Sequence, residues 1–201
     1  MSPTPLFLPA SRRSAFAIGA FSALCTLGCN PPGPRIDPAM LASYREQFQS
    51  STELAAPVTV AEVRATLEKA EDPAATTPVV LIGQVGGVPN PLEETQPDFP
   101  WQTGEATFFL VDQEVASKLA AHLESQGPDH QDCPFCARAI AKSVDSMAAI
   151  SFRGKDGKPV RIGAQTLFQL EPNDVVVVEG DATLLAGKML AVDARRIHVK
   201  Q

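Results

Sequence analysis

The sequence predicts a mainly β fold with helical inserts (α+β), arranged as a five-stranded Greek-key barrel. Two observations predict it. Short segments rich in β-branched and aromatic residues recur along the chain, bounded by turns that contain glycine or proline. A short helical turn separates the third of these segments from the fourth. The resulting order of three strands, one short helix and two strands is typical of a small closed barrel.

Five segments carry the strand pattern. The first, residues 78–85 (PVVLIGQV), contains Gly83, and a glycine inside a strand predicts a bulge or a sharp bend. The Asp156-Gly157 pair predicts a tight hairpin turn after the third strand. Residues 167–170 suit the short helical turn. The remaining strands are expected at residues 106–111, 147–153, 175–180 and 189–199.

A helix is expected just before the barrel, within an N-terminal helical segment at residues 57–77. Thr59 and Glu62 form a capping box, in which each side chain bonds the backbone N–H of the other residue. The apolar residues that follow recur at helical spacing and predict a helix over residues 60–70, with the stripe Val60, Val63 and Leu67. This stripe is expected to cover one open end or side of the barrel.

A helical insert is expected at residues 113–146, between the second and third strands of the barrel domain at residues 78–201. Asp112 precedes an amphipathic stretch and is expected to cap a helix over residues 113–124. Pro134 is expected to open a second helix, since proline is favoured in the first turn.

The strand sequences also resemble a known type of domain. PVVLIGQV, ATFFLVD, LFQLEPNDVVVVEGDATL and MLAVDARRIHV resemble, in this order, the OB domains of the tRNA-anticodon-binding type. The resemblance covers residues 78–200 apart from the insert, and it implies an OB-fold.

A nucleic-acid partner is nevertheless not expected. The chain has 17 Lys and Arg against 23 Asp and Glu, a formal net charge of −6, so it lacks the basic surface that holds phosphates. An OB-fold that binds single strands stacks bases on exposed aromatic residues. Phe108, Phe109 and Phe152 are expected to fill the barrel instead.

The N-terminus predicts export and membrane anchoring. Residues 1–28 contain Arg12 and Arg13 followed by an apolar stretch, which is the layout of a signal peptide. The ending Leu27-Gly28-Cys29 resembles a bacterial lipoprotein signal, which implies cleavage before Cys29 and its lipidation. We therefore expect a cell-envelope protein, facing the periplasm or otherwise extracytoplasmic, held at the membrane by its lipid anchor.

Two further features accompany this N-terminus. Residues 29–56 begin with a proline-rich stretch and are expected to form the tether behind the anchored cysteine. Residues 11–16 also resemble a twin-arginine export motif, so the export route stays open.

The insert holds a candidate metal site. His130, Cys133 and Cys136 have the spacing H-x-x-C-x-x-C, in which two thiolates can grip one ion and an imidazole can join them. His122, on the preceding helix, is a candidate fourth ligand. Thiolate and imidazole ligands favour zinc, with Cu(I) as the alternative metal.

The same cysteines allow a redox interpretation. Cys133-Pro134-Phe135-Cys136 begins a predicted helix, where the free amides stabilise a thiolate. These four residues resemble the active-site C-x-x-C of thioredoxin-like oxidoreductases, which implies Cys133 as the nucleophile and Cys136 as the resolving thiol. A structural disulfide is the third possibility, because exported cysteines meet an oxidising compartment.

Three functions therefore stand as hypotheses. The first is a non-enzymatic binding module with a His/Cys metal site, whose partner is an unidentified envelope protein or small ligand. The second is a thiol–disulfide oxidoreductase or assembly factor. The third is a haem or metal chaperone, because the last two strands loosely resemble the periplasmic haem chaperone of cytochrome c maturation. His198 alternates with apolar neighbours and is expected to point outward from the last strand.

Overall fold

The computed structural model describes residues 36–70, 72, 76–126, 133–185 and 189–200. The predicted signal peptide at residues 1–28, the predicted lipid anchor Cys29 and the candidate ligand His130 lie outside these described residues. Nothing in the fold therefore bears on them.

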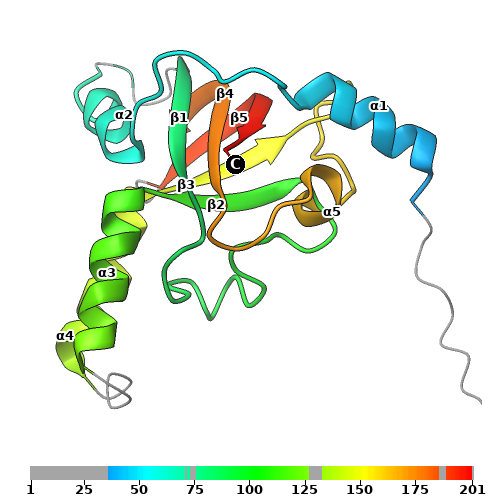
Figure 1. The fold of residues 1–201 in the computed structure, drawn as a ribbon. Helices are drawn as coiled ribbons and strands as arrows, with labels where there is room; N and C mark the ends of the chain where they lie inside the picture. The colour runs from blue at the N-terminus through cyan, green and yellow to red at the C-terminus, as the bar shows by residue number, and fades with distance from the viewer. Residues whose placement is uncertain (1–35, 71, 73–75, 127–132, 186–188, 201) are drawn as a thin grey trace, which may run out of the picture. The chain divides into compact units, whose positions relative to one another are not determined.

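The described chain forms a closed five-stranded barrel with helices, which confirms the predicted mixed α+β class (Figure 1). The strands follow one another around the barrel in the order β1-β2-β3-β5-β4. β3 and β5 pair in parallel, and the other neighbours are antiparallel. The strands are β1 (Thr77–Val85), β2 (Thr107–Val111), β3 (Met147–Phe152), β4 (Val175–Leu184) and β5 (Leu190–Val199).

Two glycines allow close approaches between strands. The pairing of β1 with β4 stays in register through Gly83, and a Cβ there would lie 2.7 Å from the Val111 carbonyl oxygen. Gly83 therefore lets β2 approach β1, and no register shift marks it. The register shift lies in β4 instead, between Glu179 and Gly180, where a Cβ would clash with the Asp193 backbone.

Two of the three aromatic residues predicted to fill the barrel do so, and the prediction was wrong for Phe109. Phe108 and Phe152 are fully buried in its core, and the ring centroid of Phe152 lies 4.6 Å from that of Phe168. Phe109 points to the other face of β2 and packs beneath the insert with Met147. None of the three predicted aromatic residues is exposed for stacking on a base.

Helices α1 (Pro38–Phe48) and α5 (Ala164–Phe168) pack together at one end of the barrel, and α5 lies in the connection between β3 and β4 (Figure 1). Helix α1 falls inside the segment 29–56 that was predicted to be a tether. It packs against α5 and β5, and the Arg45 guanidinium donates to the backbone carbonyls of Thr166 and Leu167. Residues 38–48 therefore belong to the folded unit.

Helix α2 (Val60–Leu67) covers the side of the barrel. Both bonds of the predicted capping box are present between Thr59 and Glu62. The helix ends three residues earlier than predicted, and its apolar stripe is buried against β1, β3 and β4.

The insert projects from the barrel as a helical hairpin (Figure 1). It comprises α3 (Gln113–Gln126), α4 (Pro134–Lys142) and the short 3-10 helix η2 (Ser143–Ser146). α3 and α4 lie against each other, so the start of α4 faces the end of α3. No helix in the described part of the chain is long and apolar enough to cross a membrane.

Helix α2 makes hydrogen bonds to both ends of the insert, where the insert joins the barrel. The Asp112 carboxylate, buried where β2 passes into α3, accepts from the backbone N–H groups of Val60 (2.7 Å) and Ala61 (3.0 Å). The buried Arg64 guanidinium donates to the Asp145 carbonyl (2.6 Å), just after α4. The prediction that the Asp112 side chain caps the helix after it was wrong, because both its oxygens cap α2.

Replacing Asp112 tests this arrangement. Asp112→Ala leaves the buried N–H of Val60 and the partly buried N–H of Ala61 without an acceptor, so we expect the free energy of unfolding to fall by about 1–3 kcal/mol. Asp112→Asn keeps one acceptor oxygen, so its free energy of unfolding should fall distinctly less. Urea unfolding at neutral pH measures both values. Equal stability of the Ala variant and the wild type would contradict the structural role of this carboxylate.

Candidate functional site

Cys133, Cys136 and His122 come together at the outer part of the helical insert. Cys133 is the N-cap of α4, and Pro134 occupies the first turn, as the sequence predicted. The Cys133 sulfur accepts a hydrogen bond from the Cys136 backbone N–H at 3.4 Å. His122 reaches the site from α3, and its Nε2 lies 3.7 Å from the Cys136 sulfur.

The two cysteines differ in exposure. Cys136 is fully buried between the helices, whereas Cys133 is only half-buried and can be reached from solvent. Both are free thiols in this structure. A partner molecule therefore meets Cys133 first, and Cys136 only through it.

The pKa values of the two thiols move in opposite directions. Hydrogen bonds from the Cys136 thiol and from the Cys136 and Phe135 backbone N–H groups lower the pKa of Cys133 below that of an ordinary cysteine. The same thiol–thiol hydrogen bond, together with burial, raises the pKa of Cys136. The pair therefore loses its first proton at Cys133 and keeps the proton on Cys136.

Of the four predicted metal ligands, Cys136 is in contact with both His122 and Cys133, and His130 lies outside the described residues. Among the described residues, no group of three or more His, Cys, Asp or Glu side chains is arranged to hold a metal ion. The arrangement of His122, Cys133 and Cys136 is that of two thiols one helical turn apart, with an imidazole nitrogen 3.7 Å from the inner sulfur.

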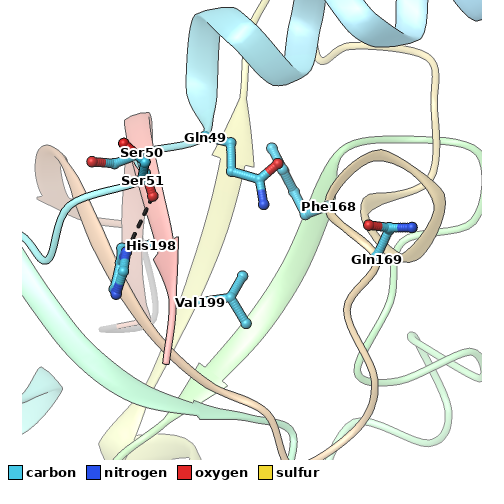
Figure 2. Close-up of a pocket in the computed structure, with 7 residues that line it drawn as sticks. All are labelled: Gln49, Ser50, Ser51, Phe168, Gln169, His198 and Val199. Atoms are coloured by element: carbon cyan, nitrogen blue, oxygen red, sulfur yellow. Dashed lines mark hydrogen bonds between the residues drawn. The ribbon is translucent and has the colours of Figure 1, made fainter. Parts of the chain in front are cut away.

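Away from the two cysteines, a cavity of about 490 Å³ lies beside the C-terminal end of β5 (Figure 2). His198 lines it from β5, where the neighbouring Ile197 is the residue buried in the barrel core. His198 is half-buried, and its Nδ1 lies 3.1 Å from the Ser50 carbonyl oxygen. A carbonyl oxygen can only accept, so Nδ1 donates and Nε2 is an acceptor when the ring is neutral. The other lining residues are Gln49, Ser50, Ser51, Phe168, Gln169 and Val199.

Comparison with protein-family models, with curated proteins and with solved structures finds no match for this chain. The site is therefore interpreted from its own geometry.

Alkylation tests the asymmetry of the two thiols. Iodoacetamide reacts with thiolates, so the rate of Cys133 alkylation should rise with pH. The midpoint of this rise should give a pKa below the value of about 8.5 for a free cysteine. Cys136 should stay unmodified in the folded chain over the same range, because it is buried and keeps its proton. Peptide mapping by mass spectrometry assigns the label. Equal labelling of both cysteines, or a Cys133 pKa of 8.5 or higher, would contradict the assignment.

Proposed function

We propose that this protein is an envelope-anchored lipoprotein that exchanges disulfides with partner proteins through Cys133 and Cys136. One observation carries the proposal: the reachable thiol has the lowered pKa, and the buried thiol has an imidazole against its sulfur. Thiol–disulfide exchange needs a thiolate for the first attack and a second thiol that attacks later.

The chemistry runs in two steps. The Cys133 thiolate attacks one sulfur of a partner disulfide, so a Cys133–partner disulfide forms and the partner's other sulfur leaves as a thiolate. Cys136 then gives its proton to His122 and attacks the Cys133 sulfur, which closes the Cys133–Cys136 disulfide and releases the second partner thiolate. Two electrons pass to the partner, whose thiolates take up protons from the imidazolium and from water.

The barrel serves as the support of this site, and we propose that it is an OB-fold. The strand order β1-β2-β3-β5-β4, the parallel pairing of β3 with β5 and the position of α5 between β3 and β4 support this assignment. The resemblance of Leu27-Gly28-Cys29 to a lipoprotein signal supports an anchor at Cys29. The partners are then envelope proteins.

Trapping the intermediate tests the proposed function. We use the full chain with Cys25→Ser and Cys29→Ser, so that Cys133 and Cys136 are its only thiols (the two-cysteine chain). Adding Cys136→Ser should stop the reaction after the first step, so that a mixed disulfide with bis(2-hydroxyethyl) disulfide accumulates on Cys133. Intact-mass measurement detects the adduct.

Two matched variants complete this experiment. Cys133→Ser in the two-cysteine chain should form no adduct at the same reagent concentration, since Cys136 is buried. His122→Gln should slow closure of the internal disulfide more than the first attack. Equal adduct formation by Cys133→Ser and Cys136→Ser would contradict the assigned roles.

Metal binding is a second candidate function, and the contact of His122 with Cys136 favours it. Imidazole and thiolate groups in contact are the ligands that zinc prefers. Zinc would be held by His122, Cys133, Cys136 and His130, with Cu(I) as the alternative metal. It would supply a structural cross-link between α3 and the start of α4.

Zinc titration tests this second function. The reduced two-cysteine chain should bind one zinc ion and melt at a higher temperature when loaded, because binding energy in such a site is folding energy. His122→Ala and His130→Ala should each weaken binding by about 10-fold or more. If neither variant changes the zinc affinity, metal binding at these four residues is contradicted, and thiol exchange remains.

A further inference from the structure

An apolar groove runs along the helical insert between α3 and α4. It has a volume of about 310 Å³ and its wall is mostly apolar. It is lined by residues of three elements: Val115, Lys118, Leu119 and His122 of α3, Ala139 and Lys142 of α4, and Ser143, Asp145 and Ser146 of η2.

The groove leads to the dithiol. His122 belongs to both, because its ring lines the groove while its Nε2 lies 3.7 Å from the Cys136 sulfur. Cys136 and Ala139 are three residues apart on α4, so they lie on neighbouring turns of one helix face. Whatever occupies the groove therefore lies beside the site where Cys133 and Cys136 react.

The rim of the groove holds two cationic side chains and one acidic side chain. Lys118 and Lys142 border it with exposed side chains, from α3 and α4 respectively. The acidic residue on the rim, Asp145, lies 3.5 Å from the Arg64 guanidinium, which also pairs with Glu68 at 3.2 Å and so offsets the charge of Asp145 only in part. Lys118 is itself paired with Glu114, so Lys142 is the stronger attraction for an anion.

A further apolar group lies next to the reactive thiol. Phe135 lies between the two cysteines in the sequence, and 73% of its surface is exposed. Such exposure is unusual for a large aromatic residue in a folded chain. It offers a contact to a polypeptide whose disulfide approaches Cys133.

We propose that the groove binds the apolar and acidic residues that flank a disulfide-bonded cysteine in a partner polypeptide, and so selects the substrates of the dithiol. This inference rests on the proposed function. The occupant is a peptide segment of apolar side chains with a neighbouring acid, because the wall is apolar and Lys142 lies at its edge. A volume of about 310 Å³ is at the lower limit for ligand pockets, which suits one or two side chains.

Two peptide probes test the proposal. Each carries one cysteine in a mixed disulfide with 2-nitro-5-thiobenzoate, whose coloured thiolate reports the exchange rate. One peptide places leucines and a glutamate beside the cysteine, and the other places serines and a lysine there. We expect the reduced two-cysteine chain to react about 10-fold faster with the leucine–glutamate peptide, which corresponds to burial of part of one leucine.

Groove variants should reduce this preference. Lys142→Glu should lower the rate ratio about fivefold at low salt, and less at high salt, where surface charges are screened. Lys142→Gln should act in the same direction by less, without placing an acid in the last turn of α4. Ala139→Leu should lower the ratio by filling the groove. Lys155→Glu, the same charge change in the distant hairpin turn, is the control and should leave the ratio unchanged.

The outcomes separate this inference from the function on which it rests. Equal rates for the two peptides in the wild-type groove would overturn the inference and leave disulfide exchange standing. A preference that survives both Lys142→Glu and Ala139→Leu would overturn it as well. Rates no higher than those of Cys133→Ser for both peptides would overturn the proposed function and the inference together.

Discussion

The buried Asp112 carboxylate is the interaction on which the placement of the insert depends. Its two oxygens cap α2, which is packed on the barrel, and its backbone N–H donates to the Ser146 carbonyl at 3.1 Å. Asp112, the residue just before the insert, is thus tied both to Ser146 at the end of the insert and to α2. Arg64 adds a second tie from α2 to Asp145. Burial raises the pKa of the Asp112 carboxyl, and the two backbone N–H groups oppose this by stabilising the carboxylate. Losing either partner leaves polar groups without a hydrogen bond.

The chemistry of the dithiol follows from this placement. Because both ends of the insert are fixed, α3 places His122 against the first turn of α4. Cys133 is the N-cap of α4, so its sulfur lies close to the backbone N–H groups of that turn. Donors at that turn stabilise a thiolate at Cys133, while packing between the helices keeps Cys136 protonated. The same two helices leave the groove between them. The barrel acts as the rigid base, and the insert carries the groups that can react or bind.

The fold was predictable from the sequence where periodicity and capping signals are local. The strand segments and the capping box at Thr59 and Glu62 lie where they were expected. Helix α1 was missed because the proline-rich start of its segment indicated a tether, although Asp37-Pro38 is a helix-start signal. The partner of Asp112 and the position of His198 depend on contacts between distant segments, which spacing along the chain does not encode. His122 was predicted only as a candidate fourth ligand on the preceding helix, and its contact with Cys136 emerges from the structure.

The reduction potential of the Cys133–Cys136 pair tests the central claim most directly. The two-cysteine chain is equilibrated with defined ratios of reduced and oxidised glutathione, quenched by alkylation and resolved by mass. We predict a reversible two-electron couple with a potential above about −300 mV, because the stabilised Cys133 thiolate favours the reduced form. A disulfide that stays closed well below about −300 mV would make the bond structural, and a pair that never closes would exclude exchange; either result contradicts the account.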